Sequence, residues 1–199
     1  APYIGYKVID VIFIYEPIAR NRREDLSNIG PLYNLLLEPY NLINRINGAN
    51  YVNNLGVKEF WLFQVGNKTI YAPESNMSSP KTGDISNSRR HDDLPIFNHT
   101  YVLYGYNYGR VGNEAVHNHG HQIEAMLSHA NWLKDRNTDL FWKNYVGRGP
   151  NNERPIGRCG DTHHPPNATR DYDYHNTRLI ESDIMDWIPV GGKKTPVNK

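Results

Sequence analysis

The stretch VKEFWLFQV at residues 57–65 predicts a β-strand, because aromatic and β-branched residues dominate it and a Gly-Asn turn signal follows. Two other stretches have the same character: YKVIDVIFIY at 6–15 and TYVLYGYNY at 100–108. Residues 6–15 are apolar at most positions, which is typical of a strand buried on both faces. We therefore expect a central sheet that contains all three.

Helical spacing of apolar residues predicts a helix over residues 31–47, interrupted by Pro39 and ended by Gly48. A longer helix is expected over residues 112–134, and a short aromatic one (LFWKNYV) over 140–146. The alternation of strands and helices predicts an α/β fold with a central mixed or partly parallel sheet flanked by helices.

Two regions lack clear periodicity. Residues 66–98 are rich in Gly, Pro, Ser, Asn and Asp and predict a long loop region with at most a short strand at 68–71. Residues 146–199 predict a loop-rich extension packed on the same core. The length of 199 residues, with no evident linker, predicts a single domain over 1–199.

Composition narrows the function classes. A formal net charge of +1 with 22% charged residues gives no field that favours nucleic acid, so none is expected as a partner. No apolar run reaches the length of a membrane span. The lone Cys159 allows no internal disulfide. Glycosylation sequons favour an extracellular setting, and they begin at Asn67, Asn76, Asn98 and Asn167. Nothing in the composition indicates an oligomeric state.

The helix expected at 112–134 carries two stripes at 100° per residue. Its apolar stripe, expected to be buried, comprises Val116, Ile123, Met126, Leu127 and Ala130. Its polar stripe comprises Glu114, His117, His121, Glu124 and Ser128. Histidines four apart project from one face a single turn apart, which allows both to bind one metal ion, and a carboxylate three residues away completes or orients the set. The same spacing also suits a carboxylate–imidazole pair that transfers protons.

A solvent-facing surface is the alternative interpretation of the polar stripe, because amphipathic helices usually expose one. However, three histidines within five residues are unusual for such a face, and Gly120 costs about 1 kcal/mol relative to alanine inside a helix. Such costs are typical of a site that needs close approach. His119 falls among the apolar residues and is expected to be a core histidine.

A second cluster lies in CGDTHHPPN at residues 159–167. Its Gly and Pro residues predict an irregular, rigid segment that directs His163 or His164 inward, and Asp161 is positioned to pair with His163 or share a metal with it. An exposed loop is the alternative. Cys159 is expected to be a small buried residue rather than a nucleophile.

Glu74 and Arg110 follow the second and third predicted strands. Ligands in α/β sheets bind beyond the carboxyl ends of the strands. If these two strands are parallel, Glu74 and Arg110 converge with Glu114 at one edge of the sheet. The acidic residues of 171–173 and 181–186 offer oxygen ligands for Ca²⁺, but they lack EF-hand spacing and are expected to be solvated.

Four stretches resemble those of large secreted proteins of bacteria and other microbes, a group to which no activity is attached: VKEFWLFQV, ESNMSSPKTGDISNS, GNEAVHNHGHQIEAML and CGDTHHPPNATRDYDY. The resemblance covers most of residues 1–190. It implies an extracellular protein whose relatives extend further at the N-terminus, so that this chain is a mature or trimmed form. It implies no reaction.

The sequence therefore predicts a secreted hydrolase that acts on an extracellular glycan, peptide or small molecule through a His/Glu site. A divalent metal is the expected cofactor, zinc before calcium, with His117, His121, Glu124 and Asp161 as candidate ligands. The candidate catalytic residues are Glu74, Arg110, Glu114, His117, His121 and His163. The alternative is a non-catalytic module that binds carbohydrate or protein through its tyrosines and tryptophans.

Overall fold

The structure is a computed structural model, and it describes residues 5–15, 20–21, 36–37, 39–64, 74–86, 94–107, 109, 112–134, 140–148 and 157–198. The chain divides into two compact units, Ala1–Val111 and Gly112–Lys199. Each unit is described by itself below. The packing of the long helix on the sheet and the single domain therefore stay predictions.

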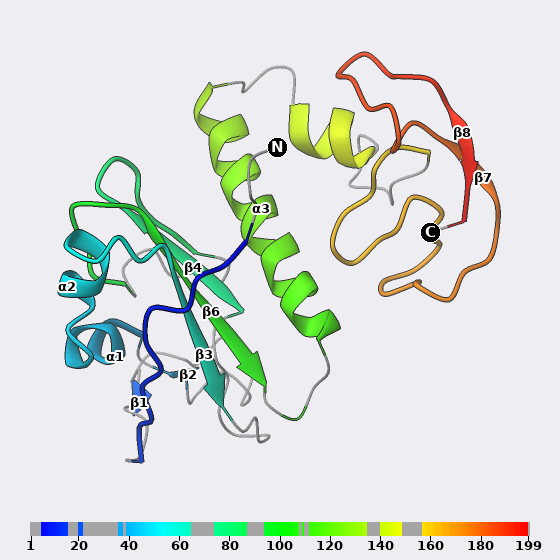
Figure 1. The fold of residues 1–199 in the computed structure, drawn as a ribbon. Helices are drawn as coiled ribbons and strands as arrows, with labels where there is room; N and C mark the ends of the chain where they lie inside the picture. Colours follow the sequence, from blue (N-terminus) through cyan, green and yellow to red (C-terminus); the bar gives the residue numbers. More distant parts are fainter. Residues whose placement is uncertain are drawn as a thin grey trace. The chain divides into compact units, whose positions relative to one another are not determined.

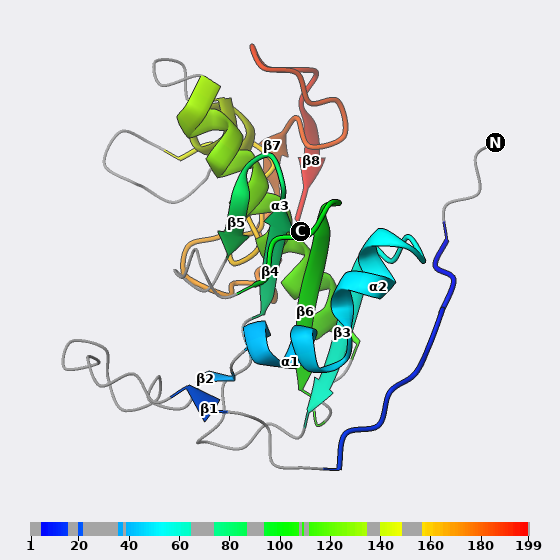
Figure 2. The same ribbon diagram turned by 90° about the vertical axis from the view of Figure 1, so that its left-hand side faces the viewer.

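The first unit is built on a four-stranded mixed sheet in the order β3-β6-β4-β5 (Figures 1 and 2). Strand β3 (Glu59–Gln64) runs parallel to β6 (Tyr101–Asn107), with Glu59 opposite Val102. Both strands and their parallel pairing agree with the sequence-based expectation. The presence of helices and a mixed sheet is compatible with the predicted α/β class.

The other two strands come from the region expected to be loop. Strands β4 (Ser75–Ser79) and β5 (Gly83–Ser86) form an antiparallel hairpin, and β4 also pairs with β6. The loop prediction is wrong for these residues because serine and asparagine are poor strand formers by propensity, whereas here every residue of β4 is buried by its neighbours. The expected strand at 68–71 lies outside the described residues.

The prediction of a central strand at residues 6–15 is also wrong. Described residues 5–15 form no regular structure (Figure 1), and Phe13 and Tyr15 are 74% and 91% exposed. The segment contacts the rest of the unit through side chains: Tyr6 packs edge-on against Trp61, and the Tyr51 hydroxyl donates to Asp10. Apolar alternation gives strand propensity only, and a strand also needs a partner for its backbone groups.

The helix expected at 31–47 is confirmed only in part: among its described residues, Leu36–Leu37 form a strand and the helix begins at Pro39, and a second short helix follows beyond residue 47. Helix α1 (Pro39–Arg45) begins at the proline that was expected to interrupt it, consistent with the preference of proline for a first helical position. Helix α2 (Gly48–Asn53) follows Asn47, whose φ of 58° turns the chain. A Cβ at Gly48 would lie 2.5 Å from Cγ2 of Ile43, so glycine permits this close approach.

Further upstream, β1 (Arg20–Asn21) pairs antiparallel with β2 (Leu36–Leu37). The buried core of the unit joins α1, α2 and β6, and it contains Ile43, Val52, Leu94, Tyr101 and Leu103. Phe60, Leu62 and Phe97 pack against this cluster.

The second unit contains helix α3 (Asn113–Lys134), the π-helical segment η2 (Leu140–Val146) and a loop-rich region. The loops carry a small antiparallel pair, β7 (Ile180–Ser182) and β8 (Thr195–Val197) (Figure 1). The expected helices and the loop-rich C-terminal region are confirmed. Among the helices of the described residues, none combines the length and apolar content that crossing a bilayer requires.

Three residues of the apolar stripe of helix α3 are exposed. Val116, Ile123 and Leu127 are 75%, 51% and 40% exposed, whereas Asn118 and Gln122 are fully buried. Their burial is expected against the sheet of the other unit, so it stays a prediction, and the side chain of Ala130 lies outside the described ones. Within the second unit, a polar loop contacts another face of the helix, as described for the site below.

Asn167 holds the loop-rich region together. Its side chain is fully buried, and its Nδ2 lies 2.9, 2.8 and 2.9 Å from the main-chain carbonyl oxygens of Asn176, Arg178 and Asn198. One amide thus joins three segments that have little regular secondary structure. Buried carbonyl groups that lose their donor retain a desolvation cost.

We expect Asn167→Ala to lower the free energy of unfolding of the second unit by about 1–3 kcal/mol, because the two N–H groups that three main-chain carbonyl oxygens share are lost. Urea denaturation followed by circular dichroism measures this change. Thr177→Ala, at an exposed position in the same region, is the control and should shift stability by no more than about 0.5 kcal/mol. Equal effects of the two substitutions would contradict the role of Asn167.

Candidate metal centre

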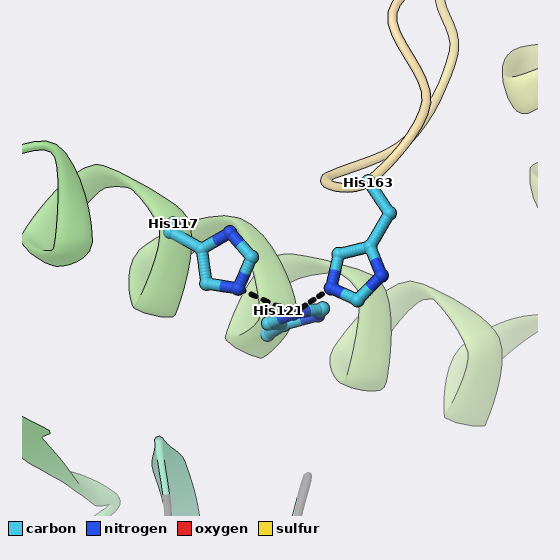
Figure 3. A group of neighbouring side chains, drawn as sticks. All are labelled: His117, His121 and His163. Atoms are coloured by element: carbon cyan, nitrogen blue, oxygen red, sulfur yellow. Dashed lines mark hydrogen bonds between the residues drawn. The ribbon is translucent and has the colours of Figure 1, made fainter. Parts of the chain in front are cut away.

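Three histidines converge in the second unit (Figure 3). His117 and His121 lie one turn apart on α3, and His163 comes from the loop that follows residue 157. Nε2 of His121 lies 3.0 Å from Nε2 of His117 and 3.0 Å from Nε2 of His163. The three candidate ligand atoms all lie within 4.8 Å of one another. Two histidines from the helix therefore meet the one that the loop was expected to direct inward.

The loop reaches the helix because residue 120 has no side chain. A Cβ at Gly120 would lie 2.6 Å from Oγ1 of Thr162, which is closer than non-bonded atoms approach. The loop itself turns at Gly160, whose φ of 76° is unfavourable for other residues and whose Cβ would collide with the His164 carbonyl oxygen. These two glycines place His163 over the helix, and they explain the helix-propensity cost noted at Gly120.

Glu124 orients His121 by contacting its Nδ1, the ring nitrogen on the side away from the other two histidines. Its Oε2 lies 2.9 Å from Nδ1 of His121, and its Oε1 accepts a hydrogen bond from the backbone N–H of Thr162. Burial alone would raise the pKa of Glu124, but the hydrogen bonds from His121 and Thr162 outweigh it and hold that pKa below its usual value. Glu124 therefore remains a carboxylate, and it contacts the imidazole nitrogen that points away from the cluster.

Asp161 organises the loop and contacts none of the three converging nitrogens. Its Oδ1 accepts hydrogen bonds from the backbone N–H groups of His163 and His164 and lies 2.9 Å from Nδ1 of His164. Its Oδ2 accepts from Arg148 at 2.7 Å, and that guanidinium lies over the Trp142 ring. Burial alone would raise the pKa of Asp161, but the hydrogen bonds from Arg148 and His164 lower it below its usual value. The carboxylate thus fixes the loop that presents His163.

Asp171 faces the third histidine of the cluster. Its Oδ1 lies 3.1 Å from Nδ1 of His163. A carboxylate can only accept a hydrogen bond, so Glu124 and Asp171 favour the proton on Nδ1 of His121 and of His163 respectively. The Nε2 atoms of these two rings then carry lone pairs, and they face each other across 3.0 Å. Two facing lone pairs repel, so a proton or a metal ion between them would stabilise the arrangement.

The spacing suits a small divalent cation. Zinc bonds to imidazole nitrogen at about 2.0–2.1 Å, which puts the nitrogens of a tetrahedral site about 3.3 Å apart. The two 3.0 Å separations in the cluster differ from this by a few tenths of an ångström. Contacts between a carboxylate and the outer nitrogen of a ligand histidine are the usual support of such sites. The third pair, His117 and His163, lies within 4.8 Å, so His117, His121 and His163 could hold a metal ion if these two rings moved closer together.

The other candidate residues lie elsewhere. Glu114 is in the first turn of α3 and outside the three-histidine group. Glu74 precedes β4 in the first unit, and Arg110 lies outside the described residues, so their convergence with the helix stays a prediction. His119 is partly buried and its Nδ1 lies 2.7 Å from the Ala115 carbonyl oxygen, in keeping with a structural role.

Cys159 is unsuited to nucleophilic catalysis. Burial, together with the nearby Asp183 carboxylate, raises the pKa of its thiol to about 11, despite the opposing effect of Arg158. A thiol rather than a thiolate is therefore present near neutral pH. This supports the structural interpretation drawn from the sequence.

Two residues of the site were missed in the sequence. Asp171 and Tyr172 both contact His163: the carboxylate faces Nδ1, and the Tyr172 hydroxyl lies 2.9 Å from Nε2. The stretch DYDY at 171–174 was considered only for its acids, as a candidate Ca²⁺ site. The pairing of an acid with a tyrosine eight or nine residues after a histidine has no fixed spacing rule, so no local signal identifies it.

We expect Gly120→Ala to weaken metal binding at least tenfold, because the added methyl group pushes Thr162 and the His163 loop away from α3. Alanine also favours the helix by about 1 kcal/mol, so stability should change less than affinity does. Titration with a zinc indicator measures the affinity. Adding Thr162→Ala to Gly120→Ala removes the colliding hydroxyl and should recover part of it. An unchanged affinity in Gly120→Ala would show that the close approach is not required.

Comparisons with known proteins give no further support to these assignments. No protein-family model matches the chain, and neither a curated protein nor a solved structure matches it. The function has to be argued from the geometry of the three histidines and the carboxylates behind them.

Proposed function

We propose that the chain is a secreted, metal-dependent hydrolase whose centre is formed by His117, His121 and His163. The observation that carries the proposal is the convergence of the three Nε2 atoms, two of which belong to rings held by a carboxylate at Nδ1. Zinc is the ion that this donor set fits best, because it favours neutral imidazole and four-coordinate geometry. Calcium requires oxygen ligands, which the cluster does not supply.

A bound proton would also relieve the repulsion between the facing nitrogens, so the donor set alone does not decide between a proton and a metal. The metal is favoured because three imidazoles converge and two carboxylates, Glu124 and Asp171, stand behind the ligand rings. A shared proton needs only two nitrogens, whereas a zinc site uses at least three protein ligands. His121 is 12% and His163 is 30% exposed, so the centre is shielded but reachable.

Three protein ligands are typical of catalytic zinc, which keeps a position for water and lowers the pKa of that water to about 7. In this chain Glu124 and Asp171 orient the imidazoles, and Asp161 with Arg148 fixes the loop. Tyr172 and Tyr174 are 50% and 40% exposed beside the site, and aromatic faces of this kind stack on sugar rings or on peptide side chains. An extracellular glycan or peptide is therefore the proposed substrate class.

The same exposed tyrosines support a second candidate, a non-catalytic binding module that a metal stabilises. The two candidates share the metal and differ in turnover. Metal-dependent hydrolysis of an activated ester such as 4-nitrophenyl acetate, lost on chelation and restored by zinc, would favour the enzyme. Metal binding with no hydrolysis of esters, peptides or glycans would favour the module.

We expect the double variant His117→Ala with His121→Ala to lose its bound zinc, because one ligand cannot hold the ion. Elemental analysis of the purified protein measures the loss, and the wild type should hold about one ion per chain. Its affinity should fall as the pH drops through about 6.5, where an ordinary imidazole gains a proton. His175→Ala, at an exposed histidine outside the cluster, is the control. Zinc-free wild-type protein after zinc dialysis would contradict the proposal.

The proposed extracellular location predicts a glycan at Asn98 when the chain passes through a eukaryotic secretory pathway. Asn98 is exposed, whereas the side chains of Asn76 and Asn167 are fully buried and would admit no glycan in the folded protein. Asn67 lies outside the described residues. Intact mass before and after glycosidase treatment measures occupancy, with Asn98→Gln as the control. A bare mass for the secreted wild type would leave the location resting on resemblance.

A further inference from the structure

The hydroxyl group of Tyr172 contacts a histidine nitrogen that would be a ligand of the proposed metal. It is 2.9 Å from Nε2 of His163, and that nitrogen is 3.0 Å from Nε2 of His121. Because Asp171 favours the proton on Nδ1 of His163, Nε2 has one lone pair, which accepts from the phenol when no metal is bound and would bind the metal when one is present. The oxygen thus stands at a distance from His163 that is close to the spacing of two ligands on one zinc ion.

The tyrosine ring is positioned by two of the three histidines. Its centroid is 4.2 Å from that of His163 and 5.9 Å from that of His117, and its plane is within 21° of the His117 ring. The ring therefore lies beside the cluster, with its hydroxyl in contact with Nε2 of His163. A tyrosine that only covered the site would not need this contact.

The backbone of Tyr172 is held in a conformation that a tyrosine rarely adopts. Its φ is 55°, in the left-handed region, and the other non-glycine residue with positive φ in the described part of the chain is an asparagine, which tolerates it. The Tyr172 N–H donates to the His163 carbonyl oxygen at 2.9 Å, which fixes this turn against the histidine loop. Left-handed bulky residues cluster at functional sites.

We propose that Tyr172 is the fourth protein ligand of the metal, so that the resting centre is formed by three histidines and one tyrosine. The inference rests on the proposed metal centre. On binding, the phenol oxygen forms the bond to the metal, and its proton, now directed at His163, is released to solvent. Hydrolysis at this centre would require zinc to bind water as a fifth ligand or the tyrosine to leave the metal, since four protein ligands alone fill a tetrahedral site.

Copper(II) tests this assignment, because a phenolate bound to Cu²⁺ produces a ligand-to-metal charge-transfer band in the visible range that imidazole ligands alone do not produce. The wild-type protein, loaded with one equivalent of Cu²⁺ after metal removal, should show this band. Tyr172→Phe should lose the band, keep the bound ion and bind zinc about tenfold more weakly. Phenylalanine retains the ring, so packing against His163 is preserved.

Tyr174→Phe is the matched control. Tyr174 is a neighbouring half-exposed tyrosine whose ring centroid is 6.1 Å from that of Tyr172, and its hydroxyl donates to the Thr162 carbonyl oxygen instead of a histidine. This variant should keep the charge-transfer band. A wild type that binds copper and zinc without the band, or a Tyr172→Phe variant with the same spectrum and zinc affinity as the wild type, would overturn the ligand assignment and leave the three-histidine centre standing. Failure of the wild type to bind either metal would overturn both.

Discussion

The contact between the Thr162 loop and the bare backbone of α3 at Gly120 is the constraint on which the site depends. It brings Thr162 within hydrogen-bonding reach of Glu124 and places His163 above His121. Any side chain at position 120 would occupy the volume that Thr162 fills. A glycine inside a helix costs about 1 kcal/mol of stability relative to alanine. In return, the loop can place His163 next to the two histidines of the helix.

A second regularity concerns the carboxylates. His121, His163 and His164 each have Nδ1 within 3.1 Å of a different acid, namely Glu124, Asp171 and Asp161. In the first two cases this leaves Nε2 as the nitrogen that faces the cluster. In the third, the acid also holds two backbone N–H groups, so the pair serves the loop rather than the cluster. The acids therefore determine which histidines present a lone pair to a shared centre and which stay structural.

The sequence predicted the parts of this arrangement that obey a local rule. The i,i+4 spacing of His117 and His121 requires only a helix, and the helix, β3 and β6 are all where periodicity placed them. Long-range partners follow no such rule. Asp171 and Tyr172 reach His163 through a turn at positive φ, and the Ser- and Asn-rich β4 becomes a strand only because its neighbours bury it.

The prediction of a strand at 6–15 fails for a related reason. Periodicity measures the preference of a segment in isolation, and burial is decided by what else packs there. On α3, for example, His121 and Glu124 are largely covered although they belong to the polar stripe.

Stability alone does not explain why this helix covers its polar face. Buried ion pairs recover at best the desolvation that they cost, and replacing them with apolar groups is often neutral or stabilising. Glu124 shows the balance directly: burial raises its pKa, and hydrogen bonds from His121 and Thr162 are needed to reverse the change. A helix that needed only to be stable would leave its histidines and Glu124 in water. The opposite arrangement is understandable where the polar contacts position imidazole nitrogens for a ligand, and it is the reason to interpret the cluster as a binding centre rather than as packing.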